Sequence, residues 1–110
     1  MSFIDARLAA LGIVLPSPPA PRAARIRMSR KIGNLLFVSG QLPSWNGELR
    51  HVGRVGDGIS LEDAQQAARL SALNVLAQAN AALPGGLDDV ISVVNLRGFV
   101  VCTPDFVRVA

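Results

Sequence analysis

GNLLFVSGQLP, residues 33–43, joins a turn signal, an apolar run and a small polar exit in one short stretch. The run 35–38 is too short and too apolar for a surface helix, so it predicts a strand buried on both faces. Ser39, Gly40 and Gln41 then place a hydroxyl, a bare backbone and an amide where that strand leaves the core. Because glycine has no side chain, a ligand can approach backbone N–H groups beside Gly40.

A second strand is expected just before this stretch. From Arg25 the sequence alternates, with Ile26 and Met28 on one face and arginines on the other, which is typical of a half-exposed strand. Gly33-Asn34 is a two-residue loop beginning with glycine and favours a type II′ hairpin turn. The first unit of the sheet is therefore predicted to be an antiparallel pair.

Helix signals lie on either side of this hairpin. Ser2 and Asp5 resemble a capping box that opens a short helix over residues 3–11, and the prolines of residues 16–21 predict an extended connector. Ser-Leu-Glu-Asp at 60–63 begins a helix expected to reach Leu83, with its apolar side along Leu61, Ala64, Ala68, Val75, Leu76, Ala79 and Leu83. Gln65, Gln66, Arg69 and Gln78 are assigned to the wetter side.

The C-terminal third is predicted to be mostly strand. Residues 91–101 are β-rich, with Gly98 as a plausible bulge, and Thr103-Pro104-Asp105 has the residues that open a helix. The element order predicts an α+β domain, with a β-sheet packed on one side by helices. We divide the chain into a helix and proline-rich connector over 1–22 and a main domain over 23–110.

Composition excludes several classes of protein. Half of the 110 residues are hydrophobic, which argues against disorder, and no apolar run approaches the roughly 20 residues that cross a bilayer. The N-terminus lacks a signal-peptide pattern, and one cysteine cannot form an internal disulfide. We expect a cytoplasmic protein with no membrane partner.

The net charge of +3 is concentrated in one strip. Arg22, Arg25, Arg27, Arg30 and Lys31 supply five of the eleven positive charges. Such a strip can contact phosphates, but it contains no aromatic residues for stacking on bases. A solvated strand face is the favoured interpretation, and nucleic acid is not the expected partner.

Few residues are candidates for chemistry. One histidine, His51, and one cysteine, Cys102, lie far apart in the sequence, so no metal site is expected. His51 is assigned an exposed or supporting role, and Cys102 a packing role. Asp88 and Asp89 are adjacent and are poor candidates for an acid and base pair. Ser39 remains, either as a ligand contact or as a serine that satisfies its own strand end.

The motif NLLFVSGQLP resembles the signature of the Rid family, also called the YjgF or endoribonuclease L-PSP family. The resemblance continues, in the family's order and spacing, through SLEDAQQAAR at 60–69, LDDV at 87–90, GFV at 98–100 and TPDF at 103–106. It implies a chorismate-mutase-like α+β domain that forms a homotrimer, with ligand clefts between subunits.

The family's active members hydrolyse reactive enamines and imines, such as 2-aminoacrylate, without a metal or organic cofactor. An arginine holds the substrate carboxylate, and an acidic residue positions the water. The resemblance implies that Ser39 and Gly40 contact a small carboxylate ligand, while the catalytic residues of this chain stay unassigned.

Two departures keep other functions open. Ile26 stands where active deaminases carry a tyrosine, and the family's arginine and glutamate belong to later strands that this sequence does not reach. We therefore expect the chain to lack the family's C-terminal portion and this 110-residue form to be inactive as a deaminase. The alternatives are a non-catalytic ligand-binding or regulatory trimer and, less favoured, an RNA-binding protein or endoribonuclease.

Overall fold

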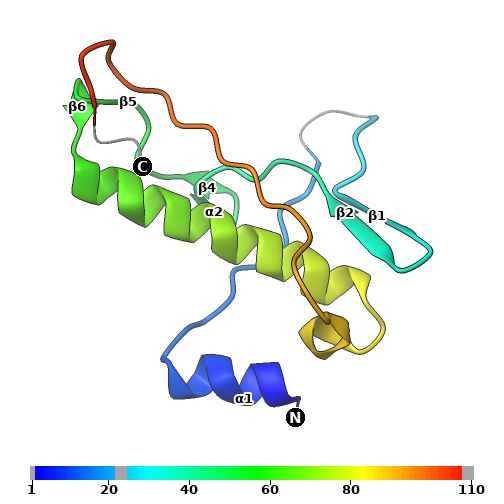
Figure 1. Ribbon diagram of the computed structural model, residues 1–110. Helices are drawn as coiled ribbons and strands as arrows, with labels where there is room; N and C mark the ends of the chain where they lie inside the picture. The colour runs from blue at the N-terminus through cyan, green and yellow to red at the C-terminus, as the bar shows by residue number, and fades with distance from the viewer. Residues whose placement is uncertain (1, 22–24, 108–110) are drawn as a thin grey trace.

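The protein is a small α+β domain in which one long helix carries short strand pairs. The computed structural model describes residues 2–21 and 25–107. Figure 1 shows the long helix α2 crossing the molecule, with the β1–β2 hairpin toward its C-terminal half and the shorter helix α1 apart from it. In chain order the elements are α1 (Phe3–Ala10), β1 (Ser29–Ile32), β2 (Leu35–Val38), β3 (Ser44–Trp45), β4 (Glu48–Leu49), β5 (Arg54–Val55), β6 (Gly58–Ile59), α2 (Leu61–Ala82) and the 3-10 helix η1 (Gly86–Asp89).

The predicted hairpin is present. β1 and β2 pair antiparallel, and Ile32 lies opposite Leu35, so Gly33 and Asn34 form the two-residue loop. Gly33 has a φ of 57° whereas Asn34 is not among the positive-φ residues, as a type II′ turn requires. The turn prediction is therefore confirmed.

Two details of the hairpin differ from expectation. The first strand begins at Ser29 rather than Arg25, and residues 25–28 lie in a turn and a bend. β2 is not buried on both faces, because Leu35 is 48% and Phe37 55% exposed. The reason is topological: β2 pairs only with β1, and α2 covers one side of the pair.

The other strand pairs are minimal. β3 and β4 form an antiparallel pair around an Asn46-Gly47 turn, in which both residues have positive φ. β5 and β6 pair parallel across a glycine-rich turn that includes Gly56, with a φ of 91°. These pairs hold the segment between β2 and α2 in place while leaving it largely exposed.

α2 begins with the predicted capping box. The Ser60 hydroxyl accepts the Asp63 N–H at 3.0 Å, and the Asp63 carboxylate accepts the Ser60 N–H at 3.4 Å. These two bonds satisfy helix donors that have no partner in the first turn. α2 packs against β1, β2, β3 and η1, and its buried residues are Leu70, Asn74, Ala77, Gln78 and Ala79.

The prediction that Gln78 lies on the solvent-exposed side of α2 is wrong. Gln78 is 5% exposed, and its amide donates to the Pro19 carbonyl at 2.7 Å. Ser17 N–H donates to Asn46 Oδ1 at 2.8 Å in the same connector. The proline segment cannot form ladder hydrogen bonds of its own, so side chains from α2 and from the β3–β4 turn hold it.

Asp88 has a structural role. Its carboxylate accepts the N–H groups of Phe3 and Ile4 at 2.9 and 2.8 Å, which caps the N-terminus of α1 beside the Ser2 hydroxyl. Asp89 accepts the Gly85 N–H at 2.8 Å. The two carboxylates thus serve different backbone donors.

The strand predicted over residues 91–101 is absent. This segment returns along α2 as extended chain (Figure 1) and joins β5 at its end, where the Val55 N–H donates to the Val101 carbonyl at 3.0 Å. Its large side chains are exposed, Ile91 by 99% and Phe99 by 93%. The residues favour a strand, but no neighbouring strand is available within the described chain, and strands need partners. Because residues 91–101 form no strand, Gly98 does not form the expected β-bulge.

The helix predicted from Thr103 is also not formed within the described residues. Pro104 and Asp105 lie in a turn closed by a hydrogen bond from the Phe106 N–H to the Thr103 carbonyl, and 108–110 lie outside the described residues. Across 2–21 and 25–107, no helix has both the length and the apolar character needed to traverse a bilayer.

Candidate functional site

Ser39 lies at the end of β2 with both of its donors in use. Its hydroxyl donates to the Arg27 carbonyl at 2.6 Å, and its N–H donates to the Met28 carbonyl at 2.9 Å. These bonds hold residues 27–28 beside the strand end. The hydroxyl oxygen keeps lone pairs with which it can accept a hydrogen bond.

Gly40 is open to solvent. A Cβ built on it would meet nothing within 4 Å, and its φ is not in the left-handed region. Among the described residues, no hydrogen bond uses the Gly40 N–H. The end of β2 therefore offers a backbone donor next to a hydroxyl acceptor.

Asn74 fixes this strand end to α2 and was not predicted. It is fully buried, and its amide donates to the carbonyls of Leu42 at 3.1 Å and Ser44 at 2.7 Å. The Gln41 amide donates to the Ser39 carbonyl at 2.9 Å. Asn74 lies one turn from Leu70 and from Ala77 on the buried side of α2, and this interruption of an apolar stripe was the available signal.

Two acceptors near this strand end are buried without a donor among the described residues. They are Oε1 of Gln41 and Oδ1 of Asn74. A buried acceptor without a partner costs roughly 1–3 kcal/mol, so such oxygens commonly bond to water or to another molecule. The segment that follows Gly40 is thus positioned by amide groups whose acceptors are not all satisfied.

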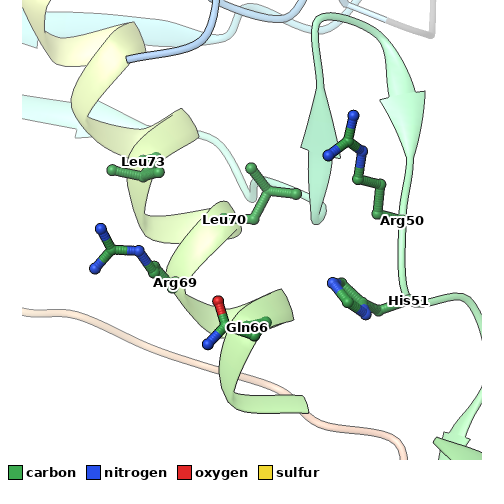
Figure 2. Close-up of a pocket in the computed structure, with 6 residues that line it drawn as sticks. All are labelled: Arg50, His51, Gln66, Arg69, Leu70 and Leu73. Atoms are coloured by element: carbon green, nitrogen blue, oxygen red, sulfur yellow. The ribbon is translucent and has the colours of Figure 1, made fainter. Parts of the chain in front are cut away.

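A separate hollow of about 190 Å³ lies between α2 and the chain that follows β4 (Figure 2). It is lined by Arg50, His51, Gln66, Arg69, Leu70 and Leu73. Leu70 is the buried member of this set. Neither Ser39 nor Gly40 belongs to the lining, so the hollow is distinct from the end of β2.

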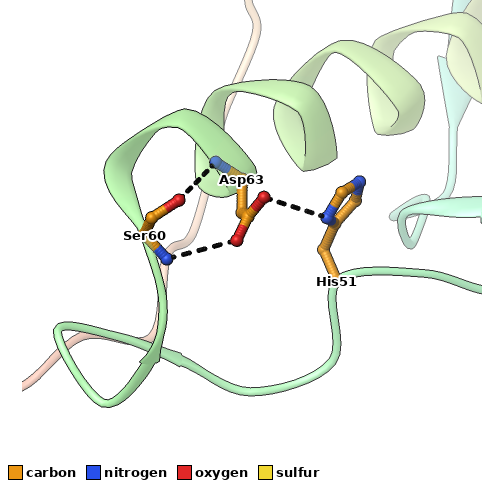
Figure 3. A network of polar contacts seen from close by, with 3 residues as sticks. All are labelled: His51, Ser60 and Asp63. Carbon is orange, nitrogen blue, oxygen red and sulfur yellow. Dashed lines mark hydrogen bonds and ion pairs between the residues drawn. The ribbon is translucent and has the colours of Figure 1, made fainter.

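His51 is held by the capping box of α2 (Figure 3). Its Nδ1 lies 4.0 Å from Oδ1 of Asp63, whose other oxygen accepts the Ser60 N–H. His51 has a φ of 55°, a left-handed conformation that histidine adopts more readily than most residues. The expected supporting role of His51 fits this half-buried position beside a carboxylate.

The remaining candidates stand apart. Cys102 is half-buried and free, and it forms an isolated bridge with Val55. Within residues 2–21 and 25–107, no group of histidine, cysteine and acidic side chains is arranged to hold a metal ion. Of the basic strip, Arg25, Arg27, Arg30 and Lys31 are exposed, and Arg22 lies outside the described residues.

Comparison with known proteins gives relatives with little functional description. No family model matches the sequence. The chain is 40% identical over 103 residues to Protein TCP17 of Trypanosoma cruzi, a match that covers 94% of this chain and 63% of that protein. The name of that relative does not state an activity.

Two solved structures are similar to the chain. One is protein Atu1372 of Agrobacterium tumefaciens, of unknown function, with a TM-score of 0.81, 42% identity and coverage of 94% of this chain and 61% of that one. The other is described as a "putative endoribonuclease" of Shewanella oneidensis, with a TM-score of 0.70, 32% identity and coverage of 76% and 54%. This chain shares their fold. It spans less than two thirds of the length of each of these relatives.

Proposed function

We propose that this chain is part of a Rid-type protein that binds small enamine, imine or keto-acid-like carboxylates at the end of β2. The observation that carries the proposal is the Gly40 N–H beside the Ser39 hydroxyl. No hydrogen bond among the described residues uses this N–H, and Gly40 is exposed, with nothing within 4 Å of a Cβ built on it. The Shewanella structure, whose description names an endoribonuclease, supports the same family.

The donors and acceptors suit such a ligand. The Gly40 N–H can donate to a carboxylate oxygen, and the Ser39 oxygen can accept a hydrogen bond from an enamine or imine N–H. Hydrolysis then needs water to add to the imine carbon, a proton to reach nitrogen and ammonia to leave, giving a 2-oxo acid. Ser39 and Gly40 hold the ligand in this scheme, and no residue is assigned the proton transfers.

Assembly into a trimer is part of the proposal. The segment 90–101 exposes a series of large apolar side chains, among them Ile91, Val94 and Phe99, each more than four fifths exposed. An exposed apolar series of this length is characteristic of a surface that another chain covers. Clefts between subunits would then complete the ligand site that one chain leaves open at Gly40.

The site is tested with a stable carboxylate and a matched pair of variants at Gly40. Titration of the ¹⁵N-labelled chain with 2-oxobutanoate is expected to move the Gly40 amide resonance, and Gly40→Val is expected to weaken binding roughly tenfold by blocking its N–H. Gly40→Ala is the control, because a Cβ at Gly40 meets nothing within 4 Å and a methyl group covers the N–H less than an isopropyl group does. An unmoved Gly40 resonance, or equal effects of the two variants, would contradict the site.

Ammonia release from freshly generated 2-aminoacrylate separates catalysis from binding. Acceleration by the assembled protein supports the deaminase. Binding without acceleration favours the alternative, a non-catalytic ligand-binding or regulatory trimer.

RNA binding stays the second candidate, supported by four exposed cations in residues 25–31 and by the description of the Shewanella protein. Phosphate contacts must weaken when charge is reversed. Arg25→Glu with Arg27→Glu is expected to reduce binding of a single-stranded RNA and to lower its salt dependence. Unchanged binding in this variant would exclude the strip as an RNA surface.

A further inference from the structure

The hollow between α2 and residues 50–51 combines cations with an apolar floor. Gln66, Arg69, Leu70 and Leu73 follow one another at helical spacing on one side of α2, and Arg50 and His51 face them from the chain after β4. Leu70, 9% exposed, lies between the two arginines in Figure 2. Leu70 and Arg50 face each other across the hollow in Figure 2, whereas the exposed Arg69 side chain extends from α2 away from Arg50.

The positive charges of this hollow are not neutralised within the described chain. Neither Arg50 nor Arg69 has a carboxylate within 4.0 Å among the described residues. The nearby acidic residue, Asp63, faces His51 and the Ser60 N–H instead. The side chains that line the hollow thus supply several donors and, apart from the Gln66 amide oxygen and the imidazole, no acceptor.

We propose that this hollow binds a small organic dianion, in which two anionic groups are joined by a short apolar part. Guanidinium groups bind carboxylates through paired N–H donors. Arg50 can hold one end of such a ligand, and Arg69, whose exposed side chain can turn over the hollow, can hold the other. The apolar middle lies over Leu70 and gains from leaving water. His51 and Gln66 add donors along the rim. A volume of about 190 Å³ is suited to a ligand of this kind rather than to a cofactor.

His51 provides a direct probe, because it is the one histidine of the chain and lines the hollow. Adipate and glutarate are titrated into the 110-residue protein while the imidazole resonances of His51 are followed by NMR. We expect saturable shifts with at least one of the two dicarboxylates. Butyrate, with one carboxylate, is expected to bind at least tenfold more weakly, and pyrophosphate, with charge but no apolar part, is also expected to bind more weakly.

The arginines are tested by a pair of variants with equal net charge. Arg50→Gln with Arg69→Gln is expected to weaken adipate binding at least tenfold. Arg7→Gln with Arg30→Gln removes the same charge from α1 and β1, outside the hollow, and is expected to leave binding within about twofold of wild type. Circular dichroism of both variants shows whether the fold is kept.

Three results would overturn the proposal. They are the absence of saturable His51 shifts with both dicarboxylates, equal losses in the two double variants, and pyrophosphate binding as tight as that of adipate, which would indicate charge attraction alone. Because Gly40 lies outside the hollow, ligand binding at Gly40 can succeed or fail independently of these results.

Discussion

Asn74 shows how a single polar side chain organises this small protein. It is fully buried on α2, and its amide donates to the carbonyl of Leu42, between β2 and β3, and to that of Ser44, the first residue of β3. A Leu or Ala side chain at this position could pack. The carbonyls of Leu42 and Ser44 would then lose this hydrogen-bond donor at positions that are partly or fully buried. Asn74 therefore connects the long helix to the strand end that carries Ser39 and Gly40.

The first prediction concerns this residue. Asn74→Ala is expected to lower the free energy of unfolding by about 2 kcal/mol, because the Leu42 and Ser44 carbonyls lose their shared donor. Urea denaturation followed by circular dichroism measures the change. Gln65→Ala, an exposed position on the same helix, should change stability by less than about 0.5 kcal/mol. Equal effects of the two substitutions would show that the Asn74 hydrogen bonds contribute nothing.

Residues whose role is local were predictable from the sequence. Ser60 and Asp63 cap α2 as their spacing indicates, and Gly33 forms the hairpin turn. The buried hydrogen bonds of Asn74 and Gln78 were not predicted. Their partners lie 30 and 59 residues away, and the helical pattern of α2 does not indicate which distant segments pack against it. The open backbone at Gly40 was expected, whereas the hollow at Arg50 and Arg69 joins segments that nothing in the sequence brings together.

At the scale of elements, helices were predicted better than strands. α1 and α2 begin where their caps indicate, because a helix satisfies its hydrogen bonds within its own segment. Residues 91–101 have the composition of a strand, but a strand exists only beside another strand. The same dependence explains β2, which is apolar enough for burial and yet half exposed at the edge of a two-stranded pair.

The second prediction concerns α1. It has no buried residue, and an isolated helix of eight residues is unstable in water, so its connection to Asp88 matters. Asp88→Ala is expected to remove the acceptor of two N–H groups, at a cost of about 1 kcal/mol, and to reduce exchange protection of the α1 amides. Hydrogen exchange measures this, and α2 amides should keep their protection.

Asp105→Ala is the control for this experiment, because Asp105 is exposed and lies in the turn after Thr103. Unchanged protection of α1 in Asp88→Ala would show that the helix is held by other contacts.

At the scale of the whole molecule, the apolar surface exceeds what one chain covers. Within residues 2–21 and 25–107 the buried apolar residues are few, namely Pro16, Val55, Leu70, Ala77, Ala79 and Leu87, while long side chains of residues 90–101 face solvent. A fully packed domain of this size buries roughly two thirds of the surface that its unfolded chain exposes. We expect association with further chains to cover the exposed apolar side chains of residues 90–101.

The third prediction tests that association. Val94→Lys with Phe99→Lys is expected to shift the protein toward monomer in sedimentation equilibrium, because two charges would have to enter an apolar interface. Val52→Lys is the control, since Val52 is 76% exposed but lies outside the segment. A wild-type protein that stays monomeric at tens of micromolar would contradict the trimer.

The anchors of the N-terminal arm also set an order of events during synthesis. Residues 3–19 leave the ribosome before the residues that anchor them, which follow much later in the chain: Asn46 by 29 residues, Gln78 by 59 and Asp88 by 85. Contacts between distant parts of a chain form slowly, because the intervening loop must close. Residues 3–19 are therefore synthesised well before they can reach their place, and until α2 and η1 exist they remain accessible to chaperones and proteases.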